Sequence, residues 1–208
     1  MKLKSIFLII LFISIPSIAQ ESLTNLSWEI GLPTSKMGQY MGKESYRGFG
    51  LDFKKFLTKN TSVGLSIGWN LFDQRLDESI NLSTENISGT VSGTQIRYIN
   101  TFPILVNCNY YIGKRNDLRT FIGLGAGMYY VLQRLDIGVY RIDSKNWHIG
   151  IAPEGGLLIP VFDSGTTFLA AVRYNYAFDA GKSIGGNENN FYSYWSIRLG
   201  ISISNRWY

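Results

Sequence analysis

The sequence predicts an all-β protein whose fold is an eight-stranded antiparallel up-and-down transmembrane β-barrel. Three observations predict it: eight segments in which apolar residues recur at every second position, connections that alternate in length, and a low content of charge. Charged residues make up 17% of the 208-residue chain, whereas an average soluble domain carries about 25%. A surface that faces water throughout needs more charge, so we expect part of this surface to face lipid.

Residues 1–19 are predicted to be a cleavable signal peptide. A short basic start precedes an apolar run that ends near Ile15, and Ser17-Ile18-Ala19 is a small-x-small cleavage site. We therefore expect cleavage after Ala19 and a barrel domain over residues 20–208. In this mature region no stretch reaches the roughly 18 apolar residues that a membrane-spanning helix requires.

The mature region alternates apolar residues with polar or small ones, which is typical of strands that have two different faces. The clearest case is the third segment, where Val63, Leu65 and Ile67 alternate with Gly64 and Ser66. No segment has the period of a helix, and no second domain is expected. The predicted strands cover residues 24–33, 46–57, 61–71, 94–112, 118–132, 146–160, 166–178 and 191–204.

The connections between these segments alternate between short turns and longer polar links. The turns are expected at 58–60, 113–117 and 161–165, and the links at 34–45, 72–93, 133–145 and 179–190. Outer-membrane barrels have short turns on the periplasmic side and longer loops on the outside. The asymmetry therefore predicts that the links lie outside, where 72–93 and the long fourth strand would form a hairpin.

The second face of the strands consists mostly of small residues, such as Gly123, Gly125 and Gly127. A soluble lipocalin-like barrel would carry many Lys and Glu residues on this face, because the face would meet water. An eight-stranded barrel is only just wide enough for its own side chains to fill it. Small residues therefore indicate the inside of a narrow barrel.

Six charged residues fall in phase with this small-residue face. A charge removed from water is tolerated only when it is paired and hydrogen-bonded. Five of the six lie at a similar depth, so we expect a structural charge cluster in the lower lumen, with Arg97 higher; the alternative is a conducting or catalytic role. The residues are Glu29, Asp52, Glu154, Arg173, Arg198 and Arg97.

Aromatic residues gather at both ends of the predicted strands, which predicts the two girdles of a membrane barrel. On the side of the short turns they are Phe53, Phe56, Tyr110 and Phe168. On the side of the long links they are Trp69, Phe72, Tyr98, Tyr130, Trp147, Tyr176, Phe178 and Trp195.

Pro103 and Pro153 lie inside predicted strands. Proline has no N–H group to donate to a ladder, and a closed barrel has no free edge at which to place it. We therefore expect a bulge or a broken ladder bond near each proline.

Other candidates for chemistry are few, and no catalytic residue, metal site or cofactor is expected. His148, the only histidine, falls in the lumen phase, but the sequence contains no compact serine, histidine and acid signature. Cys108 is expected on the lipid face as a small apolar side chain, and one cysteine forms no internal disulfide. The basic residues are scattered, which argues against nucleic acid as a partner.

These features together resemble the small outer-membrane β-barrel family of Gram-negative bacteria, which includes OmpX-like proteins and the OmpA membrane domain, within the porin family. The resemblance covers roughly residues 20–208 and also rests on the glycine-rich run at 121–127 and the aromatic terminus Trp207-Tyr208. One departure is that Tyr208 falls one residue outside the outward phase. The resemblance implies a location in the outer membrane, with lipid, lipopolysaccharide and, through the C-terminal strand, the outer-membrane assembly machinery as partners.

Three functions remain open at this point. The first is a structural or surface-interaction barrel whose lumen is plugged by polar and charged side chains and whose 72–93 link meets a protein or ligand. The second is a narrow pore or transporter for small solutes. The third is a lipid-modifying outer-membrane enzyme, which would depend on residues such as His148.

Overall fold

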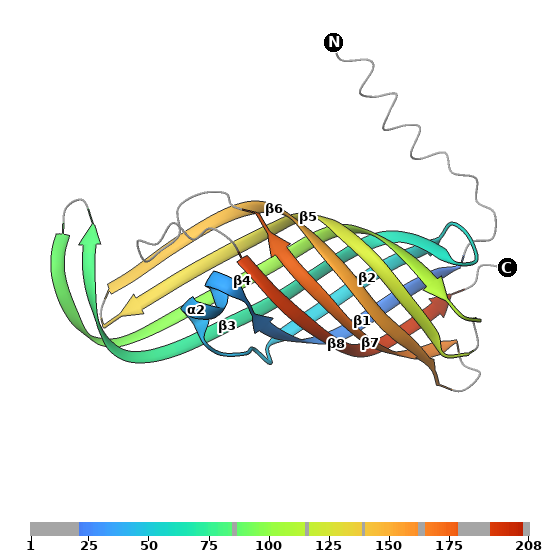
Figure 1. Ribbon diagram of the computed structural model, residues 1–208, viewed down its shortest axis with the longest axis horizontal. Coiled ribbons are helices and arrows are strands. Elements are labelled where there is room, and N and C mark those ends of the chain that lie inside the picture. Colours follow the sequence, from blue (N-terminus) through green and yellow to red (C-terminus); the bar gives the residue numbers. More distant parts are fainter. Residues whose placement is uncertain are drawn as a thin grey trace, which may run out of the picture.

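The computed structural model describes residues 21–84, 87–114, 117–138, 140–161, 165–178 and 192–205, with only the backbone described over 77–93. Eight antiparallel strands form a closed barrel in chain order, and β8 closes on β1 (Figure 1). This architecture confirms the predicted fold class. The strands are β1 (Ser22–Pro33), β2 (Gly48–Phe56), β3 (Thr61–Thr84), β4 (Ile87–Ile112), β5 (Arg119–Ile137), β6 (Tyr140–Pro160), β7 (Thr166–Ala177) and β8 (Tyr192–Asn205).

The apolar residues of the strands face outward, because successive side chains on a strand point to opposite faces. Along β8, Trp195 and Leu199 are 42% and 45% exposed, whereas Ser196 and Arg198 between them are fully buried. The same alternation runs around the barrel and leaves Val106, among many others, exposed on the outside. The molecule therefore has an apolar outer wall and encloses its charged strand residues, the reverse of a soluble barrel.

Most of the predicted girdle residues lie on this outer wall, including Phe53 and Phe168 near the short turns and Trp147 near the other end. For two residues the prediction of a girdle position is wrong. Phe56 and Phe72 are buried in the lumen, because each stands in the inward phase of its strand. The sequence assigns these two residues to a girdle because they are aromatic. Whether a side chain faces the lumen or the outside depends instead on its position in the alternation along the strand.

The predicted hairpin at 72–93 is confirmed, since β3 and β4 stay paired out to Thr84 and Ile87 and project beyond the barrel (Figure 1). The expectation of a loop at 133–145 is wrong, because β5 continues to Ile137 and β6 already begins at Tyr140. The polar residues of this segment are partners across the ladder. They form the ion pairs Arg134–Asp143 and Arg141–Asp136, of 2.9 and 2.8 Å, and such cross-strand pairs stabilise a hairpin.

The expectation that the chain contains no helix is also wrong. A short helix, α2 (Ser35–Met41), lies in the first long link and packs against β8, β1 and β3. Met37 and Met41, on the side of the helix that faces the barrel, are buried. A helix this short is held by tertiary packing rather than by its own propensity, so it leaves no periodic signal in the sequence. Within the described residues, no helix is long and apolar enough to cross a membrane.

Both strand prolines interrupt a ladder, as predicted. In the β3–β4 ladder the pairs of Phe102 and Pro103 are missing, and in the β6–β7 ladder those of Ala152 and Pro153 are missing. The register is the same on both sides of each gap. The barrel therefore accommodates each proline by losing ladder bonds and not by inserting a bulge.

The core of the protein is the lumen, where two apolar clusters flank a polar band. Along β7, Leu169 and Ala171 come first, then Arg173 and Asn175, and Ala177 last. We call the cluster at the short-turn end the lower apolar layer: Leu23, Phe56, Tyr111, Phe121, Leu158, Leu169 and Ala171. We call the other cluster the upper apolar layer: Met37, Met41, Phe72, Ile99, Leu105, Tyr129, Val131, Ala152, Ala177, Tyr192 and Tyr194.

The backbones of β1 and β8 lie so close together at the closing seam that one position on β8 requires glycine. Gly200 of β8 stands opposite Ser27 of β1. A Cβ atom at Gly200 would lie 2.7 Å from Ser27 Cα and would collide with the Leu26 carbonyl oxygen. Both are backbone atoms, so no rotation of a side chain can relieve the clash.

We expect Gly200→Val to lower the free energy of unfolding by at least about 2 kcal/mol, as an overpacked site does, or to prevent refolding. The measurement is urea unfolding of the protein in lipid vesicles, followed by tryptophan fluorescence. Gly155→Val is the matched control, because a Cβ there meets only the Phe121 carbonyl oxygen at 3.6 Å. Equal losses in the two variants would contradict this account of the seam.

Candidate functional site

The inward phase of five strands carries charged side chains into the middle of the lumen. Each of these side chains belongs to a residue that is at most 6% exposed. They lie between the two apolar layers, and acids and bases are equal in number, so their formal charges cancel. We call this set the central charge network: Glu29 from β1, Asp52 and Lys54 from β2, Glu154 from β6, Arg173 from β7 and Arg198 from β8.

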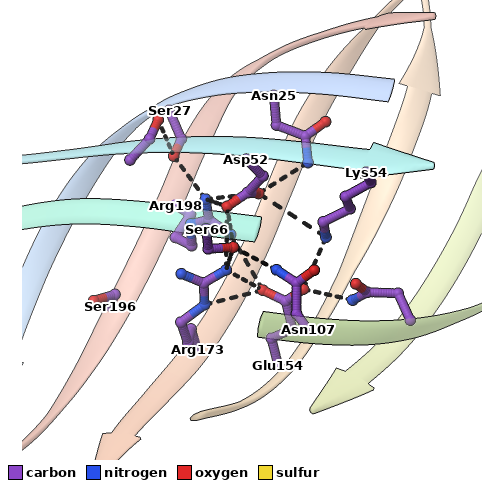
Figure 2. A network of polar contacts seen from close by, with 12 residues as sticks. Asn25, Ser27, Asp52, Lys54, Ser66, Asn107, Glu154, Arg173, Ser196 and Arg198 are labelled. Atoms are coloured by element: carbon purple, nitrogen blue, oxygen red, sulfur yellow. Dashed lines mark hydrogen bonds and ion pairs between the residues drawn. The ribbon is translucent and has the colours of Figure 1, made fainter. Parts of the chain in front are cut away.

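Arg198 is the hub of the network (Figure 2). Its Nε donates to Glu29 Oε1 at 2.9 Å, and its Nη2 donates to both carboxylate oxygens of Asp52 at 3.0 Å. Its Nη1 donates to Glu154 Oε2 at 3.2 Å. Glu29 and Arg198 stand opposite each other on β1 and β8, so one guanidinium group joins the two strands of the closing seam to β2 and β6.

Glu154 is the second centre of the network. It accepts hydrogen bonds from Arg173 Nη2 at 2.7 Å and from Lys54 Nζ at 2.9 Å, besides the one from Arg198 (Figure 2). Arg173 Nη2 also lies 3.4 Å from Asp52 Oδ1. Two carboxylates, Asp52 and Glu154, therefore share three cations, whereas Glu29 is paired with Arg198.

Neutral side chains supply the remaining donors. An ion pair in a water-poor interior compensates for its lost hydration only when further hydrogen bonds satisfy the remaining lone pairs. The neutral donors to the three carboxylates are Asn25 to Asp52 at 3.0 Å, Ser66 to Asp52 at 2.6 Å, Asn70 to Glu29 at 3.0 Å, and Asn109 to Glu154.

Five of the six residues that the sequence places in the lumen lie together in this network: Glu29, Asp52, Glu154, Arg173 and Arg198. Arg97 is separate and lies towards the long-loop end, where its Nη1 donates to the Tyr40 carbonyl oxygen at 2.9 Å. Its guanidinium carbon stacks over the Tyr40 ring, 4.5 Å from the centroid.

Two buried cations are missing from the sequence-based prediction. Lys54 shares the inward phase of Asp52, and this period-two signal was sufficient to find it. Arg119, at the short-turn end, lies 5.0 Å over the Phe56 ring and 4.6 Å over the Tyr111 ring. Arg119 begins its strand, where phase is hardest to assign from sequence.

The other candidate residues have ordinary packing contacts. His148 is buried at the end of the β6–β7 ladder, with Nδ1 2.8 Å from the Phe178 carbonyl oxygen and its ring edge-on to Tyr192 at 5.0 Å. Cys108 is exposed on the outward face of β4. Among the described residues, no three or more His, Cys, Asp or Glu side chains are grouped to bind a metal ion.

We expect Arg198→Met to lower the free energy of unfolding by about 3–5 kcal/mol, because loss of one partner leaves buried charge uncompensated. Urea unfolding in vesicles measures the loss. Adding Glu29→Gln should recover part of it, since an unpaired carboxylate is then removed. Arg141→Met is the control, because its ion pair with Asp136 is exposed and its loss should not move the midpoint. If the double variant Arg198→Met/Glu29→Gln were less stable than Arg198→Met alone, the loss could not be attributed to an unpaired carboxylate.

No protein-family model matches the chain, and no curated protein matches it. Among solved structures, Ail, the attachment invasion locus protein of Yersinia pestis, is similar over 90% of this chain and 100% of its own, with a TM-score of 0.53 and 10% identity. Ail in complex with the heparin analogue sucrose octasulfate has the same coverage, a TM-score of 0.52 and 13% identity. At such identities the likeness is one of fold. The chain thus has the fold of the small outer-membrane β-barrels, in agreement with the location expected from its sequence.

Proposed function

We propose that this protein is an integral outer-membrane β-barrel with a structural or surface-interaction role, and that its own side chains plug the lumen. The observation that carries the proposal is the central charge network. Each of its cations has a carboxylate oxygen within 2.9 Å, and an apolar layer lies on either side of it. Ions or solutes that passed would have to break these contacts.

The burial of the central charge network favours a plugged lumen rather than an open pore. The charges that line an aqueous pore are hydrated, whereas Asp52 and Arg198 have no exposed surface. Hydrating either group would require water to cross an apolar layer. The interior therefore resembles the core of a soluble protein, which stabilises the wall instead of conducting through it.

The outer wall supports an integral membrane location. Val106, Ile122 and Ile149 are 66%, 62% and 68% exposed, and in water an apolar surface that surrounds a protein would cause association. Lipid and lipopolysaccharide are the partners that fit this wall. Contact of the C-terminal strand with the outer-membrane assembly machinery stays a prediction, and residues 206–208 lie outside the described part of the chain.

The projecting hairpins are the proposed sites of surface interaction. The β3–β4 hairpin extends furthest from the barrel (Figure 1), and it contains the 72–93 segment that we expect to meet a protein or ligand. In this proposal the barrel is an anchor and the hairpin presents the contact surface.

A transporter for small solutes with a lateral exit is the second candidate. The ladder gaps at Pro103 and Pro153 favour it, because neighbouring strands are not joined by ladder bonds there. The enzyme alternative has no comparable support, since the contacts of His148 described above are with a backbone carbonyl and a ring.

We expect no stable current from the refolded chain without residues 1–19 in a planar lipid bilayer. Arg173→Ala and Arg198→Ala should leak, because each leaves a carboxylate short of a cation and opens space for water. Arg141→Ala, which alters only an exposed ion pair, is the control and should stay silent. Steady current from the unsubstituted barrel would overturn the plugged lumen and make the central charge network the candidate filter of a narrow pore.

A further inference from the structure

The upper apolar layer is completed by a helix and not by the barrel wall alone. Met37 and Met41 of α2 are 3% and 1% exposed and insert into this layer. The space beneath α2, which we call the upper chamber, is bounded by the upper apolar layer together with the buried polar side chains of Gln133 and His148, which contact Tyr192. It is occupied by the two flexible, unbranched side chains of Met37 and Met41. Its wall comes from β3, β4, β5, β7 and β8, through Phe72, Ile99, Val131, Ala177, Tyr192 and Tyr194.

Arg97 lies at the rim of the upper chamber and is satisfied only by neutral groups. Its Nη1 donates to the Tyr40 carbonyl oxygen and its Nη2 to Gln95 Oε1 at 3.2 Å. Its Nε is buried without a hydrogen-bond acceptor. No described carboxylate forms an ion pair with Arg97, whereas Arg173 and Arg198 each contact at least two carboxylates. The positive charge of Arg97 is therefore not neutralised by the described protein.

The helix that covers the chamber is short and strained at its start. Ser35, its first residue, has φ +51°, and it is the one described non-glycine residue with a positive φ. Such a conformation is costly for an L-residue. The N-cap residue Thr34 makes no side-chain cap hydrogen bond; its hydroxyl donates to Ser193 instead. Moving α2 outward would release this strain, and it would free Arg97 from its hydrogen bond and stacking contact with Tyr40.

We propose that the upper chamber binds an anionic amphiphile that enters from the long-loop end and displaces α2. An alkyl chain would take the place of Met37 and Met41 against the apolar wall. A carboxylate or phosphate head group would accept hydrogen bonds from Arg97, including one from its Nε. A guanidinium group presents a planar fork of donors that matches such head groups. One molecule thus supplies both the apolar group and the anion that this site fits.

The ligand is bound and not conducted, because the chamber ends at the central charge network. The layers meet along β8, where the buried Tyr194 is followed in the inward phase by Ser196 and Arg198. The proposal does not depend on whether the network itself conducts ions, since the site lies entirely above it.

The test follows the position of α2 by fluorine NMR in nanodiscs of a zwitterionic lipid. Gln39, exposed on α2, is replaced by cysteine and labelled with a trifluoromethyl group in a Cys108→Ser background. Octanoate and octyl phosphate are the probes, and they distinguish a fatty-acid source from a phospholipid source. Octyltrimethylammonium tests the head group with the same chain, and inorganic phosphate tests the anion without a chain.

We expect octanoate, octyl phosphate or both to produce a second, saturable resonance. Arg97→Gln should weaken the apparent affinity about tenfold or more, as loss of charge-assisted hydrogen bonds does, and Arg97→Lys should weaken it less. Arg75→Gln, at an exposed arginine of β3, should leave the affinity unchanged. Ala177→Leu narrows the chamber without touching Arg97 and should also weaken binding, so the result does not rest on Arg97 variants alone.

Three results would overturn the proposal or one of its parts. An equal response to octyltrimethylammonium would overturn the role of Arg97, and a response to inorganic phosphate alone would overturn the apolar part of the site. No resonance shift with either anionic amphiphile, in a sample whose ligand-free spectrum shows a seated α2, would overturn the proposal as a whole.

Discussion

The narrow lumen of an eight-stranded barrel forces every inward-facing side chain to find its partners inside the barrel. Most inward positions meet this constraint with a small or apolar residue. Where charge is present, it must be paired and hydrogen-bonded at once, because little water is available to compensate. The central charge network is the result, with Arg198 bonded to Glu29, Asp52 and Glu154.

The network also couples the two ends of the chain. Arg198 and Arg173 come from the last two strands, and Glu29 and Asp52 come from the first two; the Arg198–Glu29 bond joins residues 169 positions apart. Arg173 can pair with Glu154 across the β6–β7 ladder, but Glu29 of β1 meets Arg198 of β8 only when the seam closes. Closing the seam therefore completes the pairing of Glu29 with Arg198, so closure and this ion pair favour each other. A barrel in which local pairing and long-range pairing agree has fewer competing arrangements.

Most of the fold was predictable from the sequence because a period of two reports directly on the faces of a strand. The same phase brought five of the six predicted lumen residues together, and applied to Lys54 it would have added that residue too. The failures have a different cause. The ends of β5 and β6 carry Arg134 and Asp143, whose polarity indicates a loop, although here each residue is satisfied by the other strand. Helix α2 depends on what it packs against, and its seven residues contain no record of that surface.

Arg97 differs from the buried arginines of the central charge network, and the difference separates stability from recognition. Arg173 and Arg198 are neutralised by carboxylates of the same chain, and an apolar layer at either end keeps water from these pairs. Arg97 is held by a carbonyl and an amide oxygen, and it lies beside α2, towards the long-loop end. A charge that the protein neutralises stabilises the fold. A charge that the protein leaves to neutral acceptors, at the end of the lumen that a removable helix covers, retains free energy for binding an anion.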